Sequence, residues 1–178
     1  SYVGVGASQG AVAALRSGQI DAISNLDPVI TILARANDIK IVSDTRDVAE
    51  ADQIFGGPMP AATLYSPVGF IDKNPNTVQA LTNAIVRANK WIQQAGPSDI
   101  VKAVPESFLL GDRAVYIDAF LKAQKALSPD GMIPEQGAAT ALRALQSVDE
   151  KLQGVKLDLK SVYTNDFVRK ANAKYPKG

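Results

Sequence analysis

Short apolar runs alternate with helically spaced apolar residues at the start of the chain. The runs are Tyr2–Val5, Ile20–Leu26 and Ile39–Val42, and their length is typical of strands. Residues 9–17 and 29–36 lie between them and repeat their apolar positions at the spacing of a helix. This order predicts strand, helix, strand, helix, strand, which implies a parallel sheet with right-handed crossovers.

Residues that begin and end helices support this pattern. Ser8 is a plausible N-cap for the first helix, and Gly18 is well placed to end it in the left-handed conformation. Asp27 followed by Pro28 is a strong start signal for the second helix, because proline lacks an amide hydrogen that would be unpaired there anyway.

The alternation breaks at residues 43–60, which are first polar and then rich in glycine and proline, and these residues predict a connection between two units. Residues 61–71 are strand-like, although Pro67 indicates an edge strand or a broken one. The rest of the chain is nearly all helical in pattern. We expect helices at residues 75–94, 98–104, 112–127 and 134–147, and a last one from Thr164 or Asn165 to about Lys174.

Composition narrows the possible functions. The 178 residues suffice for one ordinary domain or two small lobes, and 46% of them are hydrophobic, which permits a real core. A net charge of +1 provides no field to attract nucleic acid, so no nucleic-acid partner is expected. No apolar stretch is long enough to span a bilayer, and no secretory signal opens the sequence, which suggests a cytoplasmic protein or a mature or trimmed chain.

The chain contains neither cysteine nor histidine. This excludes disulfides, thiolate nucleophiles, serine–histidine triads and most zinc sites. No pair of carboxylates is set up for acid–base work, although carboxylate or lysine chemistry stays open. We therefore expect no cofactor, no metal and no enzymatic activity.

The first candidate site is GVGASQG, which follows a strand and opens a helix. Its glycines are spaced one residue too far apart for a dinucleotide fingerprint, and no acidic residue ends the second strand. Free backbone N–H groups and the Ser8 hydroxyl would instead form a small anion pocket beside Ala7 and Gln9. A simple tight turn is the alternative.

The second candidate is DAISNLDP, which carries Ser24, Asn25 and Asp27 at the next junction from strand to helix. Ligands of open α/β sheets bind at the carboxyl ends of strands, so Ser8 and Asn25 would face the same crevice. Alternatively, Asp27 caps its helix and its two neighbours satisfy local backbone groups. A cap suits Asp27 better than a ligand contact does, because its carboxylate would repel an anion.

A third stretch carries Thr63 and Tyr65 where the chain crosses between the two expected units. Tyr65 could line a cleft or pack on an edge strand. The sequence favours packing slightly.

Four segments resemble, in the expected order and over essentially the whole chain, periplasmic solute-binding proteins of ABC importers. The resemblance is to the nitrate/sulfonate/taurine type, which also looks like the thiamine-precursor-binding group. The segments are SGQIDAISNLDPVITIL, GFIDKNPNTVQALTNAI, LSPDGMIPEQG and LDLKSVYTNDFV.

The resemblance implies an α/β fold, a periplasmic-binding-protein-like clamshell of type II, of which this chain is an incomplete C-terminal portion. Residues 1–48 would belong to lobe two, residues 49–60 to the crossover or hinge, and residues 61–178 to lobe one. The ligand-binding residues would be Ala7, Ser8, Gln9, Ser24, Asn25, Asp27, Thr63 and Tyr65. Leu26 stands where sulfonate and taurine binders of this type often carry an aromatic residue, which leaves the substrate class open.

The implied function is capture of a small organic or inorganic anion for delivery to an ABC permease in the inner membrane. The protein would be periplasmic, or extracellular and lipid-anchored. Its other partner would be the missing N-terminal half of the same protein or a second copy. Two alternatives share the fold: the effector-binding domain of a transcription regulator, and an enzyme resembling a thiamine-precursor synthase. The lack of histidine disfavours the synthase, which supplies a histidine of its own to the product.

Overall fold

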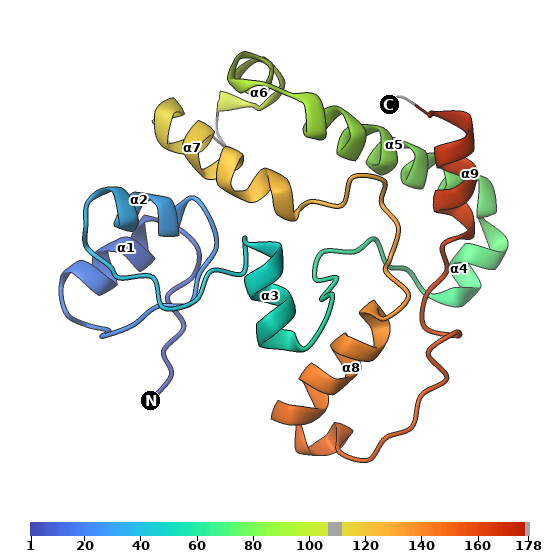
Figure 1. Ribbon diagram of the computed structural model, residues 1–178, viewed down its shortest axis with the longest axis horizontal. Helices are drawn as coiled ribbons and strands as arrows, with labels where there is room; N and C mark the ends of the chain where they lie inside the picture. The colour runs from blue at the N-terminus through green and yellow to red at the C-terminus, as the bar shows by residue number, and fades with distance from the viewer. Residues whose placement is uncertain (107–111, 177–178) are drawn as a thin grey trace. The chain divides into compact units, whose positions relative to one another are not determined.

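The computed structural model describes residues 1–106 and 112–176, in which helices are joined by irregular segments (Figure 1). None of these described residues forms a β-strand. The expected α/β class, and with it the periplasmic-binding-protein-like clamshell of type II, is therefore wrong for this chain.

The expected strands lack partners. Residues 1–5, 20–24 and 39–43 take part in no backbone–backbone hydrogen bond within the described part of the chain. A strand exists only when its backbone groups pair with those of a neighbour, so apolar composition alone does not make one. The fourth expected strand is also wrong, because residues 61–67 are irregular and Val68–Lys73 forms helix α4 directly after Pro67.

Most helices lie where the capping signals predicted them. Confirmed in position, with ends that differ by a few residues, are α1 (Gln9–Arg16), α2 (Val29–Arg35), α5 (Pro75–Gln94), α6 (Pro97–Ala103), α7 (Arg113–Ala123), α8 (Gly137–Val148) and α9 (Asp166–Lys174). Two short 3₁₀ helices, η2 (Gln124–Ala126) and η3 (Glu150–Leu152), follow α7 and α8.

One helix falls inside the segment expected to be a plain connection. Helix α3 (Val48–Phe55) begins after Asp47, whose side chain accepts a hydrogen bond of 2.9 Å from the Glu50 N–H, and ends at Gly56. Both residues are ordinary helix-end signals, so these local contacts define the ends of a helix of which no residue is fully buried.

The chain divides into two compact units, each built from two separate segments. The first unit contains residues 1–44 and 95–124, and the second contains residues 45–94 and 125–178. These units group residues that contact one another. The expected assignment of residues 1–48 to lobe two, 49–60 to the hinge and 61–178 to lobe one stays a prediction.

In the first unit, α1 packs against α2, and α2 also contacts α7. The core of the α1–α2 pair consists of Ala11, Val12, Val29 and Leu33. Gly18 follows α1 with a φ angle of 72°, which confirms the predicted left-handed end of that helix. Each irregular segment adds a partly buried residue to this core, namely Val5, Ile23 and Ile39.

In the second unit, α5 lies beside α9 (Figure 1). Val78, Thr82 and Val86 are buried at intervals of four residues and so form one stripe along α5. The Gln79 side chain donates a hydrogen bond of 2.9 Å to the Phe167 carbonyl, which fixes the register of the two helices.

Candidate functional site

The turn that leads into α1 leaves several hydrogen-bond donors unused. Ser8 stands at the N-cap position in extended conformation, but its side chain makes no capping hydrogen bond. The N–H groups of Gln9 and Gly10 have no partner among the described residues, whereas the Ala11 N–H bonds the Ser8 carbonyl at 3.0 Å. One hydroxyl and two backbone N–H groups are therefore available at the start of this helix.

Asn25 connects the second junction to this turn. Its side-chain amide donates a hydrogen bond of 2.8 Å to the Gly6 carbonyl, and its side-chain oxygen accepts one of 2.9 Å from the Leu26 N–H. The sequence predicted that the two junctions would lie together, and this contact links Asn25 to the turn before Ser8. Ala7, Gln9 and Ser24 are all exposed in the same unit. That any of them binds a ligand stays a prediction.

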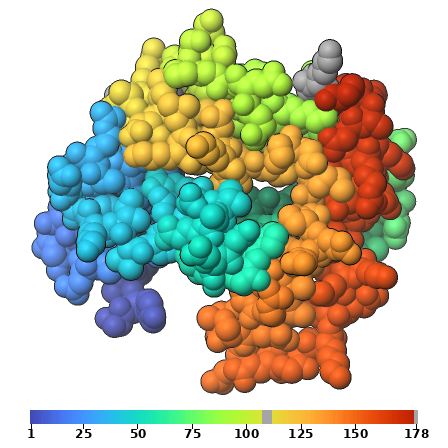
Figure 2. All heavy atoms as spheres, in the orientation of Figure 1, coloured from blue at the N-terminus to red at the C-terminus, as the bar shows by residue number. Residues whose placement is uncertain are grey.

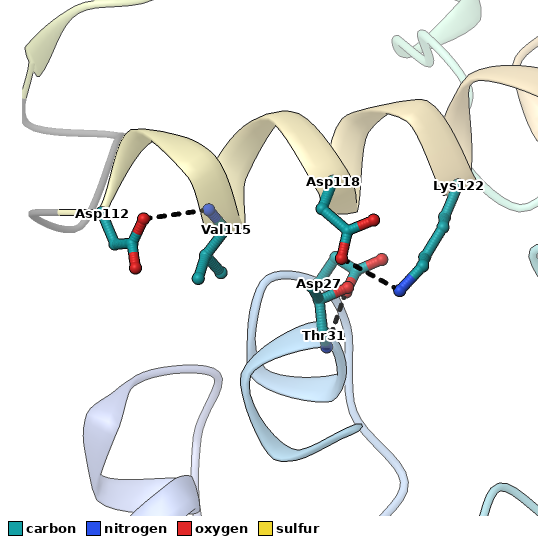
Figure 3. Close-up of polar contacts among 6 residues, drawn as sticks. All are labelled: Asp27, Thr31, Asp112, Val115, Asp118 and Lys122. Atoms are coloured by element: carbon teal, nitrogen blue, oxygen red, sulfur yellow. Dashed lines mark hydrogen bonds and ion pairs between the residues drawn. The ribbon is translucent and has the colours of Figure 1, made fainter. Parts of the chain in front are cut away.

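Asp27 stands one residue before the N-cap of α2, which is Pro28, and its side chain bonds the first turn of that helix, as the capping role expected for it requires. One of its carboxylate oxygens accepts hydrogen bonds from the Thr31 N–H at 3.1 Å and from the Thr31 hydroxyl at 2.7 Å (Figure 3). Thr31 is fully buried. A ligand contact by the same carboxylate stays a prediction.

Asp27 and Pro28, which precede α2, lie beside residues of α7. Helix α7 is itself capped by Asp112, whose carboxylate accepts from the N–H groups of Ala114 and Val115. In the second half of α7, Asp118 and Lys122 form an ion pair of 3.2 Å (Figure 3).

Two adjoining cavities lie along this contact and share Pro28 and Tyr116. The smaller one, of about 190 Å³, is lined by Asp27, Pro28, Tyr116, Ala119, Phe120 and Ala123. The larger one, of about 250 Å³, is lined by Gln9, Arg16, Pro28, Ile32, Asp112, Val115 and Tyr116. Gln9 and Asp27, two of the predicted site residues, thus take part in cavity walls.

Sequence reasoning did not select Arg16 or Tyr116. Arg16 follows Gln9 by two helical turns and so shares its face of α1, a signal that the sequence did contain. Tyr116 lies on α7, far away in the sequence, and only the packing of α2 on α7 brings it to the cavity.

The charges around the larger cavity make it a poorer anion site than the α1 turn. The Arg16 guanidinium donates to the Asp38 carboxylate at 2.7 Å, so its charge is already balanced. Asp112 adds a second carboxylate to the wall. The α1 turn, by contrast, has no acidic residue in its first helical turn.

Thr63 and Tyr65 belong to the second unit and lie in the irregular stretch before α4. The Tyr65 side chain is 90% exposed, so its expected packing on an edge strand is wrong. Their predicted contact with a ligand stays a prediction.

Across residues 1–106 and 112–176, no three acidic side chains gather in a way that could hold a metal ion. The same residues include no helix with both the length and the apolar character needed to cross a membrane.

Unused hydroxyl and N–H donors, with no acidic residue in their own helical turn, are features that suit a small anion or polar group. The sequence model of the NMT1-like family matches residues 2–104, more than half of the chain. The chain belongs to the NMT1-like family, which is a family of binding proteins that are typically periplasmic.

A solved structure of a protein from Bordetella bronchiseptica is similar to this chain. The two are 58% identical and superpose with a TM-score of 0.93 over 99% of this chain and 55% of that chain. This chain thus spans about half the length of that relative. A search of the curated proteins gave no match.

Proposed function

We propose that this chain is part of a solute-binding protein that captures a small anion for delivery to an ABC permease. Two observations support the proposal. The chain belongs to a family of binding proteins. The turn before α1 has the donors that an anion requires, and the observation that carries the proposal is the Ser8 hydroxyl at the N-cap with no bond to its own helix.

The electrostatics of the α1 turn suit an anion. The aligned peptide dipoles of a helix give its N-terminus a partial positive charge, and unpaired N–H groups there bind carboxylate, sulfonate or phosphate groups. Acidic residues in the first turn oppose such binding, and Glu50, Asp99 and Asp166 stand at these positions in α3, α6 and α9. Helix α1 has no such residue.

Asn25 supports the candidate site without contacting the anion. Both of its side-chain polar atoms are already bonded, to the Gly6 carbonyl and the Leu26 N–H, so it fixes the turn that precedes Ser8. Two backbone N–H groups and one hydroxyl suffice for one head group of a small anion. The oxygens of nitrate or of the sulfonate of taurine could accept from this set of donors, and the exposed Leu26 next to Asn25 would contact an apolar portion of an organic ligand.

The test is calorimetric titration of the chain with nitrate and with taurine, using variants at the two ends of α1. Ser8→Ala should weaken binding about tenfold, because a hydrogen bond to a charged group contributes about 1.5 kcal/mol or more. Ser17→Ala is the matched control, since Ser17 ends the same helix and its hydroxyl bonds only the Ala14 carbonyl. Equal affinity of Ser8→Ala and the unmodified chain would refute the assigned site.

In the cell, we expect the protein in the periplasm or lipid-anchored outside the membrane, where a permease of the inner membrane would receive its ligand. The expectation is supported by the typical location of the family.

A further inference from the structure

Three cationic side chains gather around Tyr175, the residue that follows α9 in the second unit. The Arg87 guanidinium of α5 lies 5.1 Å from the centre of the Tyr175 ring, and the Lys174 ammonium of α9 lies 5.4 Å from it. The Lys90 ammonium of α5 donates a hydrogen bond to the Tyr175 carbonyl. Figure 2 shows α9, in red, at the surface beside the green atoms of α5. We call Arg87, Lys90 and Lys174 the basic cluster.

No carboxylate of the two helices balances the basic cluster. Among the described residues, none of its three side chains forms an ion pair. Helix α5 contains no acidic residue, and the one in α9 is Asp166, which begins that helix and pairs with Arg169 at 2.9 Å. Asp130, whose main-chain carbonyl accepts from Asn172 of α9, uses a carboxylate oxygen for the Met132 N–H. The cluster therefore keeps its positive charge.

The end of α9 accounts for only part of this charge. A helix C-terminus carries the equivalent of about half a negative elementary charge, which favours nearby lysines. Lys174 stands in the last turn of α9, and Lys90 bonds the carbonyl just beyond it. Three full positive charges exceed that half charge several-fold. Because Arg87 and Lys174 approach one ring, they are no farther apart than roughly one 10 Å Debye length at moderate salt, so their repulsion is only partly screened.

We propose that the basic cluster binds a phosphate group. A guanidinium offers paired N–H donors that match phosphate oxygens, and lysine ammonium groups add positive charge. The Arg87 side chain makes no hydrogen bond among the described residues, and both Arg87 and Lys174 are exposed, so their donors can reach a group in solvent. The proposal goes beyond the proposed function, because the cluster belongs to the second unit and the α1 turn to the first.

Trp91 distinguishes the two sources of such a group, which are free phosphate and the headgroup of an anionic lipid. It is the only tryptophan of the chain, it is 43% exposed, and it follows Arg87 by four residues on α5, which places both on one face of that helix. A lipid surface on the cluster would hold Trp91 at headgroup level, where tryptophan is favoured, and shift its fluorescence to shorter wavelength. Inorganic phosphate should leave that emission unchanged.

The experiment titrates the ¹⁵N-labelled chain with inorganic phosphate at constant ionic strength, with sodium chloride as the reference. In parallel, Trp91 emission is followed with vesicles of phosphatidylglycerol and of phosphatidylcholine. We expect saturable shifts of the Lys174 and Tyr175 amides with phosphate, or of Trp91 emission with phosphatidylglycerol alone. Binding of either source supports the proposal.

Variants test whether the basic cluster carries the binding. Arg87→Gln and Lys174→Gln should each weaken it about tenfold, because each removes a charged donor to the phosphate. Lys102→Gln is the matched control, since Lys102 is also exposed and stands in the last turn of a helix, α6, but lies in the first unit. It should leave binding unchanged. The amide spectrum of each variant shows directly whether the chain is folded.

Three results would overturn the proposal. The first is no saturable binding of either phosphate or phosphatidylglycerol vesicles. The second is an equal loss in Lys102→Gln, which would mean that net charge alone attracts the anion. The third is a set of shifts centred on Gln9 and Gly10 that Ser8→Ala abolishes, which would place phosphate at the α1 turn and leave the proposed function standing.

Discussion

Replacement of Thr31 by valine tests the start of α2, which positions Asn25 and the candidate site. Valine has nearly the shape of threonine, so packing in the buried position is retained and the 2.7 Å hydrogen bond to Asp27 is lost. A hydrogen bond to a charged group contributes about 1.5–3 kcal/mol. The additional buried methyl group recovers about 0.8 kcal/mol, which leaves a net destabilisation of roughly 1–2 kcal/mol. For a unit of fewer than 100 residues, Tm should fall by roughly 5–10 °C.

A double-mutant cycle isolates this contact. Urea unfolding, followed by circular dichroism, is measured for Thr31→Val, Asp27→Ala, the double variant and the unmodified chain. We expect a coupling energy of about 1–2 kcal/mol between the two side chains. Thr82→Val is the control, because the buried Thr82 hydroxyl donates only to the Val78 carbonyl of its own helix at 2.8 Å and should cost less than about 1 kcal/mol. A coupling energy near zero, or a larger loss in Thr82→Val, would refute the assigned role of Asp27.

Two further predictions concern packing and backbone conformation. Leu33→Ala should lower the free energy of unfolding by about 3–5 kcal/mol, because Leu33 lies at 0% exposure in the α1–α2 core. The exposed Leu26→Ala should cost less than about 1 kcal/mol in the same urea titration, and similar losses would mean that the core is misplaced. Gly57→Ala should destabilise by about 1–3 kcal/mol, because Gly57 has a φ of 141° and an added Cβ would lie 3.0 Å from the Thr140 hydroxyl. Gly69→Ala, in α4 with open space around it, should be neutral or stabilising by up to ~1 kcal/mol, as thermal unfolding of both variants would reveal.

Helices could be predicted from the sequence because the residues that begin and end them act locally. Asp112 accepts from two N–H groups of its own helix, and Gly18 supplies a left-handed end within a few residues of the helix it terminates. Helix α3 carried equivalent signals in Asp47 and Gly56, but it lies between a charged stretch and a stretch rich in glycine and proline, which together predicted a plain connection.

The prediction of strands was wrong because strands do not depend on local signals alone. A strand needs a hydrogen-bonded partner, which can lie anywhere in the sequence or in another chain. Val5, Ile23 and Ile39, one residue from each expected strand, still pack against the α1–α2 core. The backbone beside them finds nothing to pair with among the described residues. Composition thus predicted neither the hydrogen bonds nor which residues pack, since Tyr2, Leu26 and Val42 of the same apolar runs are exposed.

The candidate site also depends on contacts between segments that are distant in the sequence. The two junctions were expected together at the edge of a parallel sheet; that sheet is absent, and the hydrogen bond from Asn25 to the Gly6 carbonyl links them instead. The cavity wall formed by Tyr116 could not, because it depends on how α7 packs against α2.

The central claim is that an anion binds at the N-terminal turn of α1. The most direct measurement is a titration of the ¹⁵N-labelled chain with nitrate and with taurine, followed through its backbone amide resonances. We expect saturable shifts at the amides of Gln9 and Gly10, with the amide of Ser17 at the other end of α1 unchanged. Shifts that centre on Tyr116 and Arg16, or that do not saturate at any residue, would contradict the account.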